Sequence, residues 1–269
     1  MAISLKDIRK PDKHPPRITV HGGAGVGKST LAAGAPAPIF IDIEGGLGEL
    51  DVPTLRVSTY DEVAQALEAL LDTPKHPVQH NFKTLAIDSI DWLEALIWRE
   101  VCAEHGVKDI SAIPYGQGYS GALVYWRQFL EGITALRNRM DMTIIMICHS
   151  QIQKIEEPTQ PPYDSYTLKL HKRAAALIEE FSDCIFFCQH KIATIQEDAK
   201  GFNQKRTRAI ATDRRVLHTS PSPAFTAKSR MQLPKEIDLT WAALAPHLNP
   251  QNPAKPESIQ PRKKEAKNG

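Results

Sequence analysis

The chain has 269 residues, of which 42% are hydrophobic and 24% charged, a composition typical of one globular domain or of one domain with a tail. Its 33 lysines and arginines nearly balance 31 aspartates and glutamates, and the net charge of +2 excludes a chain that is basic throughout. Because no run of about 18 apolar residues occurs, and the first residues lack the apolar core of a secretory signal, we expect neither a membrane span nor export.

Cysteine usage indicates a reducing compartment. The four cysteines are Cys102, Cys148, Cys184 and Cys188, and none of them forms a C-x-x-C pair. Two of them lie in apolar runs that are typical of buried strands. We therefore expect no zinc site and no disulfide framework, and a cytoplasmic location.

Charge is distributed unevenly along the chain. Residues 200–235 hold nine lysines and arginines against the single acid Asp213, a local charge of +8. Residues 249–269 add five basic and two acidic residues, or +3, so the remainder carries 2 − 8 − 3 = −9. A basic segment on an acidic body indicates an anionic partner, such as nucleic acid or nucleotide phosphate, or else a solvated strand face.

Strands and helices are expected to alternate through the first 190 residues. This alternation predicts an α/β fold in which helices flank a mostly parallel central sheet. Thr59 and Glu62 fit a capping box that starts one of the helices. The expected strands are 17–21, 38–43, 84–88, 143–148 and 184–189, and the expected helices are 28–33, 59–71, 90–105, 123–133, 172–181 and 240–247.

Other segments are expected to be irregular or to lie outside the parallel sheet. Residues 1–16 are predicted to be an irregular lead-in, and residues 151–170 a long polar loop. Residues 191–219 are typical of a β-hairpin near the C-terminus. Residues 249–269 have almost no apolar content and are predicted to be a disordered basic tail, which leaves one domain over 17–248.

One glycine-rich segment matches the P-loop pattern G-x-x-x-x-G-K-[ST], between an expected strand and an expected helix. Its glycines allow backbone N–H groups to turn toward phosphate oxygens, the lysine supplies a cation for the β- and γ-phosphates, and the serine hydroxyl can bind Mg²⁺. The alternative is an ordinary glycine loop. We assign ATP binding to Gly22, Gly23, Ala24, Gly25, Val26, Gly27, Lys28, Ser29 and Thr30.

A second anchor for Mg²⁺ is expected at Asp88. This acid ends an apolar strand about 60 residues after the P-loop, which is the Walker B arrangement. Ser29 and Asp88 are therefore the predicted metal residues. The alternative is that Asp88 caps the helix over 90–105.

Hydrolysis also needs a group that orients or deprotonates water. Glu44 follows the expected strand 38–43 at its C-terminal end, where open α/β sheets place their ligands. Asp42 competes for this role, and strand periodicity does not separate the two. His149 and Gln151 follow the strand 143–148 and are predicted to contact the γ-phosphate, unless they only satisfy backbone groups at the strand end.

The order of these motifs resembles that of the RecA-type P-loop ATPases. The resemblance covers residues 17–190 and rests on the P-loop, on the segment from Phe40 to Glu44, on Asp88, and on Gln151 after a later strand. It implies that Glu44 activates water and that Gln151 senses the γ-phosphate. Because His149 and Ser150 stand where RecA has a shorter approach to its glutamine, His149 is an alternative sensor.

The size of the chain and the stretch Pro221–Pro234 are more narrowly similar to bacteriophage RecA-like proteins, some of which anneal single strands. The resemblance implies side-by-side assembly in a ring or filament, a DNA-binding segment over 152–173, and cations that reach a neighbouring subunit's ATP. Tyr163 and Tyr166 are candidates for base stacking. The predicted contacts with DNA or with a neighbour's phosphate are Lys154, Lys169, Lys172, Arg173, Arg206, Arg208, Lys228 and Arg230.

The leading hypothesis is a DNA-stimulated, Mg²⁺-dependent ATPase that binds single-stranded DNA and acts in phage recombination or single-strand annealing. Its expected setting is the cytoplasm of a bacterial host, with copies of itself and a single-strand-binding protein as partners and no membrane. One alternative is a P-loop motor or accessory ATPase in replication or packaging. Another is a nucleotide-gated DNA-binding module with negligible hydrolysis, and a small-molecule kinase is a weaker option.

Overall fold

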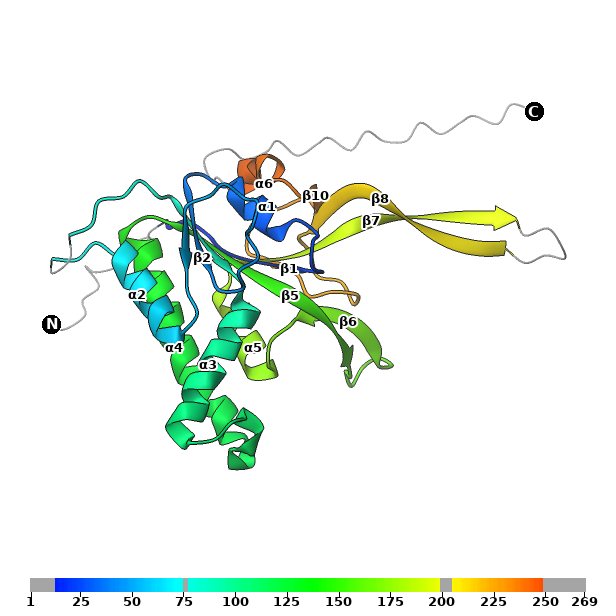
Figure 1. The fold of residues 1–269 in the computed structure, drawn as a ribbon. Helices are drawn as coiled ribbons and strands as arrows, with labels where there is room; N and C mark the ends of the chain where they lie inside the picture. The colour runs from blue at the N-terminus through cyan, green and yellow to red at the C-terminus, as the bar shows by residue number, and fades with distance from the viewer. Residues whose placement is uncertain (1–12, 75–76, 199–204, 249–269) are drawn as a thin grey trace, which may run out of the picture.

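A computed structural model describes residues 13–74, 77–198 and 205–248, with the backbone alone described for 192–198 and 205–211. A ten-stranded sheet forms its centre (Figure 1). Within these described ranges, no helix is both long enough and apolar enough to cross a membrane.

Regular structure in the described part of the chain begins at Arg17 and ends at Leu248. Residues 13–16 are irregular, while 1–12 lie outside the described residues. The tail predicted over 249–269 also lies outside them.

Six parallel strands form the body of the sheet, so the predicted α/β fold with a mostly parallel sheet is confirmed. Each of these strands except the short edge strand is almost wholly buried where it crosses the core, because helices cover both faces. In order across the sheet the strands are β7 (Cys184–Asp198), β1 (Arg17–Gly22), β5 (Thr143–Ile155), β4 (Thr84–Asp88), β2 (Pro38–Asp42) and β3 (Thr54–Arg56).

Antiparallel strands extend the sheet at one side and add two hairpins. The predicted C-terminal hairpin is confirmed: β8 (Lys205–His218) pairs with β7, and together they form an arm that projects far from the body (Figure 1). β10 (Glu236–Asp238) pairs with β8, and β9 (Lys228–Ser229) pairs with β7. The sequence predicts the turn of the C-terminal hairpin near Lys200, Gly201, Phe202 and Asn203, and these residues lie outside the described ones.

The prediction of a long polar loop over 151–170 is wrong. β5 continues to Ile155 and pairs with the antiparallel β6 (Tyr163–Leu168), so this segment is a second hairpin. Its outer part has exposed polar side chains on both strands. The sequence therefore lacks the apolar alternation that signals a half-buried strand.

Two helical layers enclose the sheet. Alternate strand residues point to opposite faces, so Leu85 and Ile87 join the larger core while Ala86 joins the smaller one. α1 (Lys28–Ala33) and α6 (Trp241–Leu248) cover the smaller core. The larger core is covered by α2 (Tyr60–Leu70), α3 (Ile90–His105), α4 (Gln117–Arg139) and α5 (Lys172–Phe181), with short 3₁₀ turns η2 (Ile110–Ala112) and η3 (Pro114–Gly116) between α3 and α4.

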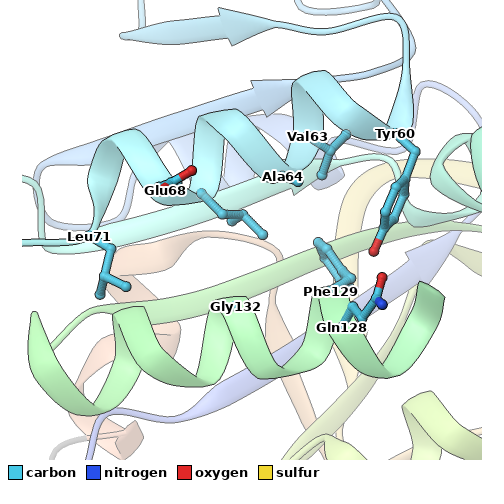
Figure 2. Close-up of a pocket in the computed structure, with 9 residues that line it drawn as sticks. Tyr60, Val63, Ala64, Glu68, Leu71, Gln128, Phe129 and Gly132 are labelled. Carbon is cyan, nitrogen blue, oxygen red and sulfur yellow. The ribbon is translucent and has the colours of Figure 1, made fainter. Parts of the chain in front are cut away.

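An apolar cavity of about 240 Å³ lies between α2 and α4 (Figure 2). Gly132 allows this close approach, because a Cβ at that position would lie 3.0 Å from Leu67 Cδ1. The predicted capping box of α2 is present at Thr59 and Glu62. The cavity contains no P-loop residue; its lining is Tyr60, Val63, Ala64, Leu67, Glu68, Leu71, Gln128, Phe129 and Gly132.

Candidate nucleotide site

Strand register brings the predicted site residues to one edge of the sheet. Gly22 at the end of β1 lies opposite His149 of β5, and Asp42 at the end of β2 lies opposite Asp88 of β4. Asp88 in turn pairs with Ile147, two residues before His149. The carboxyl ends of parallel strands are where open α/β sheets place their ligands.

Glycine is required at two P-loop positions, at one because of close packing and at the other because of the backbone conformation. A Cβ at Gly22 would lie 2.4 Å from the carbonyl oxygen of Cys188 on β7. Gly27, the N-cap of α1, has a left-handed φ of 106°, which L side chains rarely adopt. The path of the loop therefore requires glycine at positions 22 and 27.

The Lys28 ammonium lies inside the loop. Its Nζ donates to the carbonyl oxygens of Gly22 at 3.1 Å and Gly23 at 2.9 Å. Burial lowers the pKa of Lys28, while the nearby Asp88 carboxylate acts in the opposite direction. A buried lysine cation within a glycine-rich loop is a suitable counter-ion for a phosphate.

Ser29 and Asp88 are in direct contact: the Ser29 hydroxyl donates to Asp88 Oδ2 at 2.5 Å. Asp88 does not cap α3, because Ser89 is the N-cap residue of that helix. Burial raises the pKa of Asp88, and the carboxylates of Glu44 and Asp42 raise it further, against the lowering effect of the Ser29 hydrogen bond. A divalent cation beside Asp88 would relieve this repulsion.

The oxygen donors present suit Mg²⁺, which binds one or two carboxylates together with phosphate oxygens. No group of three His, Cys, Asp or Glu side chains in the described ranges forms a metal site of its own. Ser29 and Asp88 therefore fit a metal that arrives with a nucleotide, and they do not form a separate metal centre.

Side-chain geometry separates Glu44 from Asp42. Asp42 is buried and accepts a hydrogen bond from the Gly45 N–H at 2.7 Å, so it stabilises the turn after β2. Glu44 is partly exposed and accepts from the Ser89 hydroxyl at 3.2 Å. Of the two acids, Glu44 is the one that faces the other site residues.

His149 lies next to Glu44 and is fixed from behind by Asp91. Its Nε2 is 3.9 Å from Glu44 Oε1, and its Nδ1 is 3.0 Å from Asp91 Oδ2. The backbone N–H of His149 also donates to Asp91 Oδ1 at 3.1 Å. Burial alone would raise the pKa of Asp91, but these hydrogen bonds lower it below its usual range. The Nε2 side of the imidazole thus faces Glu44.

Gln151 points away from these groups. Its Nε2 donates to the carbonyl oxygens of Leu168 at 3.0 Å and Leu170 at 3.3 Å, which lie at the end of β6. Of the two residues considered as γ-phosphate sensors, His149 is the one beside Glu44, while Gln151 stabilises the β5–β6 hairpin.

The predicted basic contacts are divided between several places. Lys154 and Lys169 are exposed on or next to the β5–β6 hairpin, with Glu156 at 3.5 Å and Asp91 at 3.9 Å as their respective partners. Lys172 is exposed at the start of α5, and Arg173 donates to the hydroxyl of Ser120.

Lys228 and Arg230 do not reach the nucleotide site of this chain. Lys228 Nζ donates to the Glu179 carbonyl at 2.6 Å, and Arg230 Nη1 binds Asp183 Oδ1 at 2.9 Å. Asp183 also binds Arg17, the first residue of β1, so both cations lie at the amino edge of the sheet.

Arg206 and Arg208 belong to the distal part of β8, where only the backbone is described. In the register of the arm, Arg206 lies opposite Glu197 and Arg208 lies opposite Ile195.

Sequence reasoning missed three charged residues that the fold brings close to the site. Asp91 lies in the first turn of α3, and this helix begins directly after the carboxyl end of β4, so Asp91 starts at the same edge as Asp88. Glu94, one turn later, accepts from the His171 N–H at 2.9 Å. Arg215 reaches the P-loop from β8, and its Nη1 lies 3.5 Å from the Val26 carbonyl oxygen.

Comparison with known proteins places this site in a family. The sequence matches the AAA domain over residues 14–231, most of the chain and all of the site described above. The chain belongs to the AAA domain family. The fold and the P-loop of this AAA domain agree with the RecA-like P-loop ATPase core expected from the sequence.

Individual proteins add little to the family assignment. None of the curated proteins matches this AAA domain. Among solved structures, one with a related arrangement is described as the crystal structure of the RadB recombinase. It is 14% identical, the match covers 86% of this chain and 90% of that chain, and the TM-score is 0.46.

Proposed function

We propose that this AAA domain binds ATP with Mg²⁺, hydrolyses it, and couples hydrolysis to the binding of single-stranded DNA. One observation carries the ATPase part of the proposal. Five side chains lie together at the carboxyl edge of the parallel sheet, where the parallel pairing of four different strands ends. They are Lys28, Ser29, Asp88, Glu44 and His149. These are the groups that phosphoryl transfer to water requires.

Each of these residues has a role in the proposed reaction. Lys28 and the loop N–H groups bind the phosphates, and Ser29 and Asp88 hold Mg²⁺, which neutralises phosphate charge when bound. Glu44 orients the attacking water and accepts its proton. His149, held by Asp91, hydrogen-bonds the γ-phosphate or the water through Nε2. Departure of the γ-phosphate then changes the contacts of His149 in the middle of β5.

The ATPase proposal is tested with Glu44→Gln, which keeps the hydrogen bond from Ser89 but removes the base. We expect kcat to fall by about 100-fold or more while ATP affinity stays near that of the wild type. Glu49→Gln, an exposed acid in the same connection, is the matched control and should leave kcat unchanged. A wild-type turnover rate in Glu44→Gln would refute the assigned base, and negligible turnover in the wild type itself would favour a nucleotide-gated module.

The DNA-binding part of the proposal rests on the β5–β6 hairpin, which begins at the site. Tyr166 is 42% exposed while its ring stacks on Phe187 at 5.1 Å, and the neighbouring Ile152 is 65% exposed. Lys154 and Lys169 lie on the same hairpin or directly after it. An aromatic face flanked by lysines suits stacking on bases and binding to phosphates of a single strand. Tyr163 instead donates to Glu157 at 2.9 Å.

The biological role is proposed from the RecA resemblance. It comprises recombination or single-strand annealing in a phage, side-by-side assembly of subunits, and cooperation with a single-strand-binding protein. Within the proposed assembly, Lys228 and Arg230 at the amino edge, or Arg206 and Arg208 on the arm, supply cations to a neighbour's ATP or to DNA.

DNA binding is tested by filter binding of labelled single-stranded DNA at low salt, with and without ATP. The double change Lys154→Gln and Lys169→Gln should weaken binding by about tenfold and reduce its salt dependence, because two phosphate contacts are lost. Lys108→Gln, an exposed lysine beyond α3, is the control. Absence of wild-type binding at low salt would refute the DNA-binding proposal and leave the ATPase proposal standing.

A further inference from the structure

Arg215, at the base of the β7–β8 arm, lies against the phosphate loop. Its Nη1 is 3.5 Å from the carbonyl oxygen of Val26. A Cβ built on Gly27 would lie 2.6 Å from Nη1 and 3.4 Å from Cζ of the same guanidinium. The guanidinium therefore occupies space that any side chain at Gly27 would need, in addition to the left-handed φ of that glycine.

The sheet holds Arg215 in this place. The next two residues, Val216 and Leu217, are fully buried, and the Arg215 carbonyl accepts from the Leu239 N–H at 2.9 Å. Successive strand residues face opposite sides, and the preceding Arg214 binds Asp238 Oδ1 at 2.7 Å. Two neighbouring arginines thus have different surroundings: one is beside the P-loop and the other is paired with a surface acid.

Charge distinguishes the two arginines as well. Arg214 is neutralised by Asp238, whereas no carboxylate in the part of the chain that the structure describes forms an ion pair with Arg215. An unneutralised cation that touches a phosphate-binding loop raises the local positive potential where phosphate charge would be bound.

We propose that Arg215 is a positioning residue of the nucleotide site. It holds Val26 and Gly27 in the conformation that binds phosphate, adds positive potential there, and thereby links the β7–β8 arm to nucleotide occupancy. The inference rests on the proposed ATP binding and adds to it a residue from outside the P-loop. Because coupling between two sites is reciprocal, a ligand that fixes the base of the arm also changes nucleotide affinity.

The test compares equilibrium binding of ADP and of ATP, each with Mg²⁺, to the full chain and its variants. Arg215→Gln should weaken both nucleotides by about tenfold, because the effect acts through the loop that binds the phosphates common to both. Arg215→Lys should recover most of the affinity by restoring the charge. Arg214→Gln is the matched control and should bind like the wild type.

Any result that differs from these expectations contradicts the inference. Wild-type affinity in Arg215→Gln overturns it, and so does a loss confined to ATP, since that would place Arg215 at the γ-phosphate. A melting temperature lowered without nucleotide, with no recovery of affinity in Arg215→Lys, would show a merely structural role. If the wild type binds neither nucleotide, the proposed function fails and the inference fails with it; if the wild type binds both and Arg215→Gln is unaffected, only the inference fails.

Discussion

At the residue scale, two buried titratable groups near the site have pKa values shifted in opposite directions. His21, directly before the P-loop, donates from Nε2 to the Thr226 carbonyl at 2.7 Å, since a carbonyl can only accept. Its Nδ1 then accepts from the Ser150 hydroxyl at 2.8 Å. Burial lowers the pKa of His21 from 6.5 to about 4, and burial raises the pKa of Glu94 from 4.5 to about 7.

These shifts predict opposite dependences of stability on pH between 7 and 5. The neutral His21 loses its stabilising contribution as pH falls below 6.5, because the unfolded state then binds the proton. The cost of burying an ionised Glu94 is relieved over the same interval, because the folded state binds the proton more tightly. Each contribution changes by about 2 kcal/mol from pH 7 to pH 5, so they nearly cancel in the wild type.

Single variants separate the two contributions. On going from pH 7 to pH 5, the free energy of unfolding of His21→Gln should change by about 2 kcal/mol more favourably than that of the wild type. For Glu94→Gln the change should be about 2 kcal/mol less favourable. Urea denaturation at both pH values measures these differences, and identical pH dependences in all three proteins would contradict the assignment.

At the element scale, the middle of β5, where its pairing changes from β1 to β6, has two polar residues with separate tasks. His149 contacts Glu44 and Asp91 inside the site, whereas Gln151 binds carbonyl groups at the end of β6. These bonds attach the end of β6 to β5, the strand that carries His149, the proposed sensor. A change at His149 can reach the hairpin through the backbone bond from the Lys169 N–H to the His149 carbonyl at 2.9 Å.

This division of tasks predicts different effects of two alanine substitutions. His149→Ala should lower kcat by about 10- to 100-fold with ATP affinity retained, because it removes a group beside the base. Gln151→Ala should change basal kcat by less than about threefold but increase amide hydrogen exchange at the end of β6, because two hydrogen bonds are lost. The reverse pattern would identify Gln151 as the sensor.

At the scale of the whole molecule, the two ends of the parallel strands differ. The candidate nucleotide site lies at the carboxyl ends, while at the amino ends Asp183 forms a cluster with three arginines. This carboxylate accepts from Arg17 Nη2 at 2.9 Å and from Arg230 Nη1 at 2.9 Å, and Arg137 Nη2 lies 3.8 Å away. Burial alone would raise the pKa of Asp183, but its bonds to Arg17 lower it. The cluster joins β1, α4 and the segment after β9.

Loss of this cluster should affect stability without affecting nucleotide binding. Asp183→Asn is expected to lower the free energy of unfolding by about 2 kcal/mol, because partly buried guanidinium groups lose their carboxylate. The KM for ATP should stay unchanged, since Asp183 lies at the opposite edge from the P-loop. Asp51→Asn, an exposed acid, is the control. An unaltered urea midpoint in Asp183→Asn, or a shifted KM, would contradict this division of the molecule.

Local patterns in the sequence were sufficient for the fold class and for the phosphate loop. Apolar runs separated by helical periodicities predicted the parallel sheet, and the sequence Gly22–Ser29 predicted the loop, because the backbone conformation there depends on glycines at fixed positions. The same local reasoning failed over 151–170, where the outer part of a two-stranded ribbon has exposed polar side chains on both strands.

Only the tertiary structure decided which polar residues meet. Periodicity turns Asp42 and Glu44 to the same side of a strand, and the turn after β2 engages Asp42 while leaving Glu44 to face His149. Asp91 and Arg215 come to the site through a helix turn and through the pairing of a strand almost 190 residues after the P-loop. The Arg215 contact depends on strand register and long-range packing, which spacing along the chain does not reveal.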